Sequence, residues 1–452
     1  MLIKGKKILV MGIGITGISA IKMLMEHNNE LMVYDEKSKE EIIELLHQNE
    51  IDQVAVVDDE SKYLIQEVDF VVKSPGIPPD HHIIEFAEDK DIPVISDIEL
   101  AFNVGIQGTV IGITGTNGKT TSTMLAGEIL KKAGIQTHLA GNMGTGILQV
   151  VEKVKQEDYI VLELSSFQLE HTYLFRPQVA LITNITEDHL DWHGSFENYM
   201  ASKFKIFSNQ SADNHLILNW DDKHLRGLKD KVRPEIIWFS TQEELEEGIY
   251  LKDDSIIYRM DGAEETILEL ADIKIPGLHN IENVCGVVGI MKALKIDNGI
   301  IRESVRCFKG VEHRIEFIQE KNGISYYNDS KGTNVQSTLK AIQAMVSPVV
   351  LIAGGYDKGA DYGDLTEALV LKCRALILMG ETAEKIRKSA EENGISEIYK
   401  VKNMEEAVRT AATTGMAGDA VLLSPACASW DMYRNFEERG KHFKRIVMEL
   451  TE

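Results

Sequence analysis

The sequence contains few cysteines and no long apolar run. Its four cysteines lie far apart among 452 residues and show no paired spacing typical of a disulfide framework or a metal site. They are Cys285, Cys307, Cys373 and Cys427. No apolar run approaches the roughly 20 residues that a helix needs to span a bilayer. We therefore expect a reduced, cytoplasmic protein without membrane insertion.

Positive charge is also scarce. The sequence has 48 Lys and Arg residues against 71 Asp and Glu residues, a formal net charge of −23 at pH 7. A general nucleic-acid binder needs clustered basic surface, so this balance argues against nucleic acid as a partner. If the substrates are anionic, the overall field repels them. Glycine loops, helix N-termini, Mg²⁺ and a few lysines must then bind them locally.

The composition and the length favour a soluble protein of several domains. Apolar residues make up 44% of the sequence and charged residues 26%, which is ordinary for globular proteins. Alternating strand and helix patterns predict an α/β protein with three domains, at residues 1–98, 99–310 and 311–452. We expect Rossmann-like first and third domains. Between them we expect a P-loop mononucleotide-binding domain with an extra small β-sheet.

Residues 111–121 predict a phosphate site. An apolar strand leads into glycines, a lysine and two threonines, and then into a helix. Backbone N–H groups in such a loop bind phosphate oxygens, Lys119 adds a positive charge, and Thr120 can reach a phosphate-bound Mg²⁺. The usual P-loop would have glycine at position 113, where this chain has Ile113. We interpret the segment as a nucleoside triphosphate site.

The first domain begins with a strand and a glycine-rich turn. Gly12, Gly14 and Gly17 follow the strand, and Asp35 ends the next strand about 20 residues later, which is formally a dinucleotide fingerprint with a ribose-binding acid. The turn Ser74–Gly76 follows another predicted strand. Ligands bind at this strand edge in such sheets.

The central domain holds further candidate residues. Glu163 ends an apolar strand, and a carboxylate there commonly holds the Mg²⁺ of a nucleotide. His189 and His193 are four residues apart, but no H-E-x-x-H helix contains them, so one histidine near Mg²⁺ is favoured over a zinc pair. Lys203 lies on an amphipathic helix, and its residue pattern alone predicts a solvated side chain.

In the third domain, three strand ends are rich in polar residues and glycine. They are residues 328–334, 354–358 and 424–430. Because the carboxyl ends of parallel strands share one edge, the three segments suggest a binding surface. The charged helix predicted at residues 431–450 is expected to be mostly solvated.

Together these motifs resemble the Mur ligases, from about residue 5 to 445 and in the expected order. The displaced glycine of the phosphate loop is typical of this family. The segments that carry the resemblance are Thr114-Gly-Thr-Asn-Gly-Lys-Thr-Thr, Ser74-Pro-Gly-Ile, Glu163-Leu-Ser-Ser-Phe-Gln, Glu187-Asp-His-Leu-Asp, His279-Asn-Ile-Glu-Asn, Glu312-His-Arg, Asn328-Asp-Ser-Lys-Gly-Thr-Asn and Ser424-Pro-Ala-Cys-Ala-Ser-Trp-Asp. The last two are similar to those of the members that add D-glutamate to UDP-N-acetylmuramoyl-L-alanine.

The resemblance implies an ATP-dependent ligase of peptidoglycan precursor synthesis with two Mg²⁺ ions, and the following site residues. ATP would be bound by Gly115, Thr116, Asn117, Gly118, Lys119, Thr120, Thr121, Asn283, Arg314 and Asp329. The UDP-linked acceptor would be bound by Ile15, Thr16, Asp35, Ser74, Pro75, Gly76 and Asn142. D-Glutamate would be bound by Lys331, Thr333, Lys358, Ser429 and Phe436. Metal ligands would be Thr120, Glu163, His189 and Lys203, and catalytic residues would be Lys119, Glu163, His189 and Lys203.

In this family the lysine that matches Lys203 is carbamylated, which makes it a carboxylate-like metal ligand and reverses the expectation of a solvated side chain. Positions 36 and 37 are Glu36 and Lys37, where the family commonly has Thr-Arg, so the family's uracil-end contacts are not carried over to these two residues. Trp430 and Tyr433 stand beside the residues expected to hold glutamate. We expect a monomer.

Three alternatives remain at this point. An NAD-dependent oxidoreductase would use the first glycine turn but leave the phosphate loop without a role. A nucleotide-driven switch or transporter would use the phosphate loop but not the three strand ends of the third domain. Within the family, a ligase that adds a different amino acid is the closest alternative.

Overall fold

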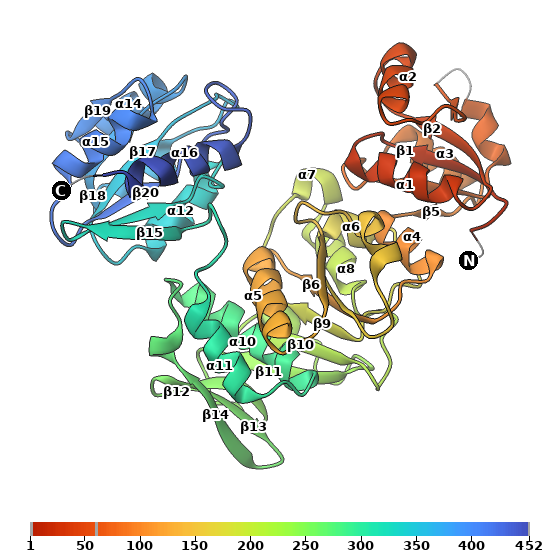
Figure 1. The fold of residues 1–452 in the computed structure, drawn as a ribbon, viewed down its shortest axis with the longest axis horizontal. Helices are drawn as coiled ribbons and strands as arrows, with labels where there is room; N and C mark the ends of the chain where they lie inside the picture. The colour runs from red at the N-terminus through yellow and green to blue at the C-terminus, as the bar shows by residue number, and fades with distance from the viewer. Residues whose placement is uncertain (1–2, 59–61, 451–452) are drawn as a thin grey trace. The chain divides into compact units, whose positions relative to one another are not determined.

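The computed structural model describes residues 3–58 and 62–450 and contains three β-sheets (Figure 1). Its contacts group the chain into two units. The first consists of Met1–Asp272 and Ile281–Val305, and holds two of the sheets. The second consists of Ile273–Asn280 and Arg306–Glu452, and holds the third sheet. The predicted α/β class is confirmed. No helix in the described ranges has both the length and the apolar character needed to cross a membrane.

The first sheet has five parallel strands in the order β3-β2-β1-β4-β5. They are β1 (Lys7–Met11), β2 (Glu30–Tyr34), β3 (Ala55–Val56), β4 (Phe70–Lys73) and β5 (Val94–Ile95). Helices α1 (Ile15–Met25) and α2 (Lys39–Gln48) pack on one face, and α3 (His82–Asp89) with the 3₁₀ segment Lys62–Glu67 covers the other. From β1 the strand order runs to β2 and β3 on one side of the sheet, and then from β4 to β5 on the other side of β1. In such sheets ligands bind beyond the carboxyl ends of the strands at the point where this order reverses.

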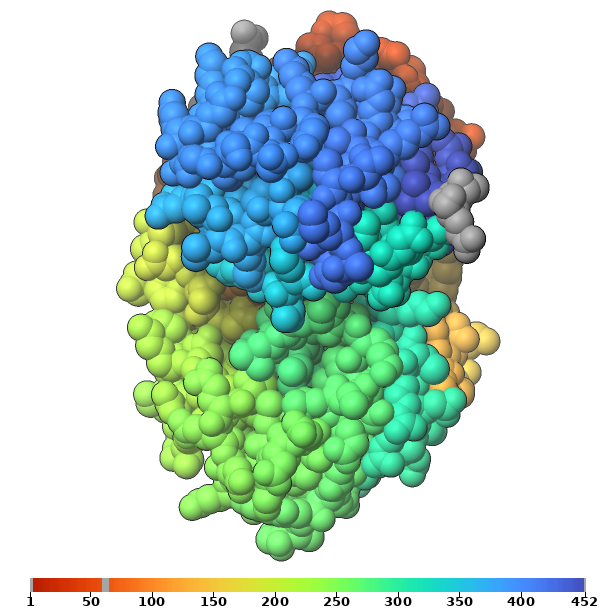
Figure 2. All heavy atoms as spheres, turned by 90° about the vertical axis from the view of Figure 1, so that its left-hand side faces the viewer, coloured from red at the N-terminus to blue at the C-terminus, as the bar shows by residue number. Residues whose placement is uncertain are grey.

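The second sheet has nine strands in the order β14-β13-β12-β11-β10-β9-β6-β8-β7. The parallel part consists of β6 (Thr109–Thr114), β7 (Thr137–Gly141), β8 (Tyr159–Glu163), β9 (Val179–Ile182), β10 (His215–Asn219) and β11 (Glu235–Ser240). An extension follows, in which β12 (Gly248–Lys252) pairs in parallel with β11, and β13 (Ser255–Met260) and β14 (Ala263–Glu269) add antiparallel pairs. This extension corresponds to the predicted small sheet and forms part of the green surface in Figure 2.

Helices of different lengths lie between residues 97 and 307, and several of them connect strands of the second sheet. They are α4 (Asp97–Val104), α5 (Lys119–Lys132), α6 (Ser166–Glu170), α7 (Leu190–His193), α8 (Phe196–Phe204), α9 (Lys223–Arg226), α10 (Leu278–Ala293) and α11 (Asn298–Cys307), with 3₁₀ turns at Ile147–Gln149, Val151–Lys153 and Leu270–Asp272. One hydrophobic cluster contains residues of both sheets of this unit, from Ile3 to Leu225. The first two sheets therefore share a core.

The third sheet has the order β15-β16-β20-β17-β18-β19. Its strands are β15 (Glu316–Lys321), β16 (Ile324–Asn328), β17 (Val349–Ala353), β18 (Cys373–Leu378), β19 (Ile398–Lys400) and β20 (Ala420–Leu423). Helices α12 (Val335–Ala344), α13 (Gly363–Leu369) and α14 (Ala383–Glu392) cover one face, and α15 (Met404–Thr414) and α16 (Phe436–Met448) cover the other. Strand β15 is antiparallel because a short turn joins it to β16.

The C-terminal helix differs from the prediction. Helix α16 begins at Phe436 rather than near residue 431, because the Asn435 side chain accepts a hydrogen bond from the N–H of Glu438 and caps it. One of its faces is buried and contains Arg439 and Phe443. The expectation of a mostly solvated helix overlooked this face, because its charged residues obscure the apolar stripe.

Candidate functional site

The phosphate loop connects β6 to α5 and requires glycine at two positions. Gly115 has φ 142° and Gly118 has φ 85°, a region that L side chains rarely adopt. A Cβ atom at Gly118 would lie 2.0 Å from Oδ1 of Asn283, and one at Gly115 would lie 2.0 Å from Oγ1 of Thr183. The loop is therefore packed tightly against the strand end at Thr183 and against helix α10.

Hydrogen bonds fix the loop to the end of β9. The N–H of Thr116 donates to the carbonyl of Asn184 over 2.9 Å, and the N–H of Asn117 donates to the Asn184 side chain over 2.9 Å. The Thr116 hydroxyl is hydrogen-bonded to the Tyr199 hydroxyl at 2.9 Å. Lys119 Nζ donates to the carbonyls of Gly115 at 2.8 Å and Thr116 at 2.9 Å. The lysine thus bonds its own loop and lies at the place where phosphate is expected.

A cavity of about 110 Å³ lies beside this loop in the first unit. It brings together four candidate site residues from the sequence analysis with five other residues. The lining residues are Lys119, Asn142, Ser165, Ser166, Phe167, Asp188, His189, Tyr199 and Lys203. Residues from the start of α5, from the segments after β7, β8 and β9, and from α8 therefore converge on one space.

Glu163 is placed as a cation ligand would be. Its carboxylate is buried, and Oε1 accepts a hydrogen bond from Asn142 Nδ2 over 2.9 Å. Its Oε2 is buried and has no hydrogen-bond partner among the described residues. A buried carboxylate oxygen without a partner is costly, and a bound cation would satisfy it. Thr120, at the start of α5, is also largely buried. These residues fit the predicted Mg²⁺.

The two histidines have different surroundings. His189 precedes α7 with φ 51°, lines the cavity and packs 4.9 Å from the Phe167 ring. His193 is buried, its Nε2 is hydrogen-bonded to Ser166 Oγ at 2.9 Å, and burial lowers its pKa to about 4. Its Nδ1 lies 3.3 Å from Ser202 Oγ. His193 therefore supports the cavity wall, and the choice of one histidine over a zinc pair agrees with this arrangement.

Lys203 is buried, so the expectation from its residue pattern alone was wrong. Its side chain is 2% exposed, Nζ donates to the Gly115 carbonyl over 2.9 Å, and the ammonium lies 4.6 Å from the Tyr199 ring centre. Burial, together with the charge of Lys119, holds the pKa of Lys203 well below its ordinary value. A lysine with a lowered pKa is a nucleophilic amine, which fits carbamate formation.

The candidate acceptor residues gather at the carboxyl edge of the first sheet. Asp35 accepts hydrogen bonds from the N–H of Ile13 at 2.8 Å and from Lys37 Nζ at 2.9 Å. Burial would raise the pKa of Asp35, but these hydrogen bonds hold it below its ordinary value. Ser74 Oγ donates to the Gly12 carbonyl over 3.0 Å. The tips of β1, β2 and β4 therefore meet, as predicted.

Close packing explains the glycine of the first helix turn. A Cβ at Gly17 would lie 1.7 Å from the Gly12 carbonyl oxygen, so only glycine fits. Ile15, at the start of α1, is 71% exposed and is available for contact with a ligand.

In the second unit, Asp329 lies at the carboxyl end of β16. It is buried, and this burial raises its pKa to about 7. Ser424 Oγ donates to Asp329 Oδ2 over 2.6 Å, and the N–H of Ile315 donates to Oδ1 over 3.2 Å. The ends of β16 and β20 are therefore joined through this carboxyl group.

The candidate glutamate residues lie at the same sheet edge. Lys358 Nζ lies 4.7 Å from the ring centre of Trp430, which packs 5.5 Å from Tyr356. Lys331 Nζ lies 5.9 Å from the ring centre of Phe436. Thr333 and Ser429 belong to the same strand-end segments. Lysines and hydroxyls at one edge suit a ligand with two carboxylates.

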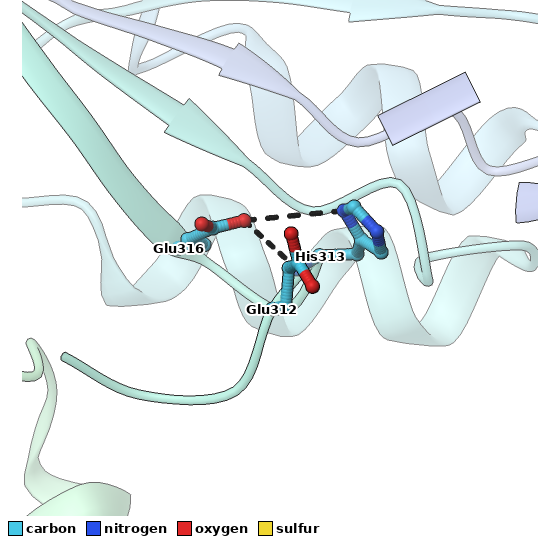
Figure 3. Close-up of side chains that lie close together, drawn as sticks. All are labelled: Glu312, His313 and Glu316. Carbon is cyan, nitrogen blue, oxygen red and sulfur yellow. Dashed lines mark hydrogen bonds and ion pairs between the residues drawn. The ribbon is translucent and has the colours of Figure 1, made fainter. Parts of the chain in front are cut away.

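A cluster of Glu312, His313 and Glu316 stands where a metal could be held (Figure 3). Lys444, however, donates from Nζ to Glu316 and, over 3.4 Å, to Glu312. The N–H of His313 donates to Glu316 Oε2 over 3.0 Å, and its ring is hydrogen-bonded to Asn328 at 2.8 Å. Because the Lys444 ammonium pairs with both glutamates, the cluster fixes the backbone of residues 312–316.

That backbone presents Arg314, a predicted nucleotide contact. Its neighbours His313 and Ile315 have φ 66° and 46°, which is uncommon for side chains of this kind. Arg314 and Asp329 belong to the second unit, whereas Asn283 belongs to the first. The remaining predicted ATP residues lie in the phosphate loop.

Several supporting residues were missed in the sequence. They are Lys73, Asn184, Trp192, Tyr199 and Arg439. Asn184 ends an apolar strand, a position at which a polar residue commonly faces a ligand edge. The others carry no local signal, because their roles arise from contacts between distant segments.

Comparison with known families assigns the chain to one of them. The Mur ligase MurD-like N-terminal domain matches residues 6–96, the Mur ligase middle domain matches residues 113–291, and the Mur ligase glutamate ligase domain matches residues 313–427. A curated relative from Thermoanaerobacter sp. (strain X514) is 44% identical over 453 residues, with 99% of each chain covered. This chain belongs to the Mur ligase family.

The relatives indicate a particular member of the family. The Thermoanaerobacter protein is named UDP-N-acetylmuramoylalanine–D-glutamate ligase. A protein of the same name from Clostridioides difficile (strain 630) is 42% identical over 455 residues, with 99% of each chain covered. This membership argues against the oxidoreductase and switch alternatives.

Solved structures share the fold. UDP-N-acetylmuramate–alanine ligase from Thermotoga maritima aligns with a TM-score of 0.58 and 18% identity, over 98% of this chain and 99% of that one. A MurF ligase from the same organism, in complex with ADP, aligns with a TM-score of 0.57 and 15% identity, over 99% of this chain and 96% of that one.

Proposed function

We propose that this chain joins D-glutamate to UDP-N-acetylmuramoyl-L-alanine with the hydrolysis of ATP to ADP and phosphate. The observation that carries the substrate assignment is the 44% identity to a relative of that name over 99% of both chains. Lys119 and Lys203 line one cavity, and Glu163 is hydrogen-bonded to Asn142 in the wall of that cavity, which supports the chemistry.

The reaction needs an activated carboxyl group. A carboxylate is a poor acyl donor because attack on it would expel oxide. Transfer of the γ-phosphoryl group of ATP to the alanyl carboxylate forms an acyl phosphate and releases ADP. The amine of D-glutamate then attacks the acyl carbon, loses a proton, and expels phosphate from the tetrahedral intermediate.

Lys119 is the residue that stabilises the transferring phosphoryl group. In the described structure its ammonium bonds the carbonyls of Gly115 and Thr116. Nucleotide phosphate would replace these carbonyls as its partner, and the N–H groups of the loop would surround the phosphate oxygens. Preorganised charges of this kind usually supply the largest part of phosphoryl-transfer catalysis.

Two Mg²⁺ ions complete the proposed site. Thr120 and Glu163 would hold one, and His189 with carbamylated Lys203 would hold the other. Bound Mg²⁺ neutralises charge on the phosphate oxygens and orients them. The unpartnered Oε2 of Glu163 supports the first position. For the second, the Lys203 amine adds to CO₂, an N–C bond forms, and one proton leaves.

The substrates are assigned to different sheets. The acceptor would bind at the first sheet through Ile15, Thr16, Asp35 and Ser74–Gly76, with Asn142 in the cavity of the second. D-Glutamate would bind at the third through Lys331, Thr333, Lys358, Ser429 and Phe436. We further propose a monomeric, cytoplasmic enzyme with domains at residues 1–98, 99–310 and 311–452.

The test is phosphate release from ATP in the presence of UDP-N-acetylmuramoyl-L-alanine and one amino acid. D-Glutamate, L-glutamate, L-lysine and D-alanine are compared in parallel. We expect turnover with D-glutamate and little with the others. Turnover with another amino acid, and none with D-glutamate, would show that the substrate assignment is wrong while the family chemistry stands.

A further inference from the structure

A buried lysine closes the acceptor turn of the first sheet. Lys73 is the last residue of β4, directly before Ser74–Gly76, and its side chain is fully buried. Its Nζ donates to the Ile77 carbonyl, across the turn. The N–H of Ile77 donates to the Ser74 carbonyl over 3.1 Å. Two hydrogen bonds to Ile77, one from the lysine and one within the backbone, therefore set the shape of the turn.

The same ammonium contacts a helix that follows strand β9 of the second sheet. It lies 4.9 Å from the ring centre of Trp192, which belongs to α7 and stands three residues after His189. The indole packs against Phe167, with ring centres 4.6 Å apart, and against His193, at 4.4 Å. Phe167 lines the catalytic cavity and packs on His189. An unbroken series of contacts thus runs from the acceptor turn to the cavity.

The contact between Lys73 and Trp192 helps to compensate a buried charge. A buried cation is costly unless other groups compensate its charge. The Ile77 carbonyl and the face of Trp192 do so directly, since the faces of aromatic rings attract cations. Burial nevertheless lowers the pKa of Lys73 to about 8, opposed by the nearby carboxylates Glu170, Asp97 and Glu88.

Trp192 depends on its ring contacts. Its indole N–H is buried and has no hydrogen-bond partner within the described chain. Buried tryptophans usually find a partner for this group. The position of the ring is therefore set by Lys73 on one side and by Phe167 and His193 on the other.

We propose that Lys73 is a positioning residue that couples occupancy of the acceptor turn to the aromatic wall of the catalytic cavity through Trp192. The inference rests on the proposed function, because it takes a UDP-linked acceptor to occupy Ser74–Gly76. An acceptor that orders this turn also fixes the Ile77 carbonyl and hence the lysine. Binding of the acceptor then helps to shape the wall beside which its own carboxylate reacts.

The first experiment follows tryptophan fluorescence during titration with UDP-N-acetylmuramoyl-L-alanine, without ATP or Mg²⁺. We expect a change in emission that is lost in Trp192→Phe and reduced at least about threefold in Lys73→Met, since a charge beside an indole alters its emission. Lys73→Arg keeps a cation and should recover much of the change. Lys90→Met, an exposed lysine after α3, is the matched control and should resemble the wild type.

Three outcomes would overturn the proposal: a full emission change in Trp192→Phe, wild-type behaviour in Lys73→Met, or no emission change in the wild type. If Lys73→Met does not fold, Lys73→Gln replaces it in both experiments, because it also removes the charge but keeps a polar end that can donate to the Ile77 carbonyl.

The second experiment is a double-mutant cycle on kcat/KM for the acceptor. If the two side chains act through one contact, Lys73→Met and Trp192→Leu should each lower kcat/KM about tenfold, and the double variant should be little worse than either. If the two substitutions acted independently, their effects would multiply, and kcat/KM of the double variant would fall about a hundredfold. This result would contradict coupling. A decrease in kcat at saturating acceptor is expected, which loss of acceptor contacts alone does not produce.

The two proposals can fail separately. If the wild type releases no phosphate with D-glutamate, the proposed function is wrong, while the fluorescence titration still reports on the contact. If turnover is normal and the cycle is multiplicative, only the coupling is wrong.

Discussion

The Nζ atom of Lys203 lies 2.9 Å from the carbonyl oxygen of Gly115, the first glycine of the phosphate loop. The lysine comes from α8, so this bond joins a helix to a loop 88 residues earlier in the chain. A buried amine beside the phosphate site, with its pKa lowered by burial, is well placed to react with CO₂.

Lys203→Ala should therefore lose most of its activity. The carbamate would supply a carboxylate that alanine cannot, and small carboxylic acids can occupy the space that remains. We expect a decrease of at least about a hundredfold in kcat, in the range found when an electrostatic group is removed from an active site, with partial recovery in formate or acetate. Mass spectrometry under CO₂ should detect the carbamate in the wild type. Unchanged activity in the alanine variant would eliminate this role.

Gly118→Ala tests the packing of the phosphate loop. The new Cβ would lie 2.0 Å from Asn283 Oδ1, and the backbone at φ 85° disfavours alanine. We expect ATP binding to weaken by at least about tenfold and the melting temperature to fall.

The matched control is Gly134→Ala. Gly134 has φ 80°, but a Cβ there meets nothing within 4 Å, so it reports the backbone strain without the collision. It should cost roughly 1–2 kcal/mol of stability and leave ATP affinity unchanged. Equal ATP affinities in the two variants would contradict the packing argument.

Trp430→Ala should weaken D-glutamate binding specifically. The indole face lies 4.7 Å from Lys358 Nζ and holds the ammonium at the sheet edge. An exposed cation–π contact is worth about 0.5–1 kcal/mol, so KM for D-glutamate should rise roughly two- to fivefold. KM for ATP and for the acceptor should not change, and Trp430→Phe should restore most of the affinity. A general fall in kcat with unchanged KM for glutamate would contradict this reading.

The raised pKa of Asp329 predicts that the stability of the folded protein depends on pH. Burial raises its pKa to about 7, so the folded chain retains a proton that an unfolded aspartate releases near pH 4. Between about pH 4 and 7 the folded state binds more protons than the unfolded state, and stability falls as pH rises. Over this pH range the contribution of Asp329 should lower the free energy of unfolding by up to about 4 kcal/mol.

Thermal unfolding without nucleotide, at pH 5 and pH 8, measures this effect. Asp329→Asn carries no titrating group, so its melting temperature should decrease less than that of the wild type between the two values. Glu367→Gln, an exposed acid on α13, is the control and should follow the wild type. Parallel curves for all three proteins would show that Asp329 contributes nothing to the pH dependence.

The strands of the third sheet show what the sequence could reveal. The sequence predicts strands at residues 324–328, 349–353 and 420–423, and the observed β16, β17 and β20 have these bounds, because each is a short apolar run between turns and polar segments. The antiparallel edge strand β15 was not predicted. Its residues alternate in burial and carry charges, so the local pattern resembles a loop.

The candidate site residues also divide into those that a local sequence pattern indicates and those that it does not. The sequence pattern pointed to Lys119 and Glu163 because one belongs to a loop with a recognisable spacing and the other ends a strand, whereas His189 was named only through the family resemblance. The burial of Lys203 could not be predicted, since the pattern of α8 does not show which polar side chain faces the phosphate loop. The contact between Lys73 and Trp192 depends on two segments more than 100 residues apart, which no local pattern reports.

The core clusters have a consequence for how such a chain could be recombined. One cluster contains residues of both sheets in the first unit, including Ile98 and Leu100 at the passage between them. The two described clusters of the third sheet consist of residues 315–450. If two related chains were joined at about residue 98, the junction would therefore divide one hydrophobic core. The two halves of that core would come from different proteins and would not be matched to each other. A junction before residue 315 leaves those clusters whole, so residues 315–450 could be exchanged between members of the family as a unit.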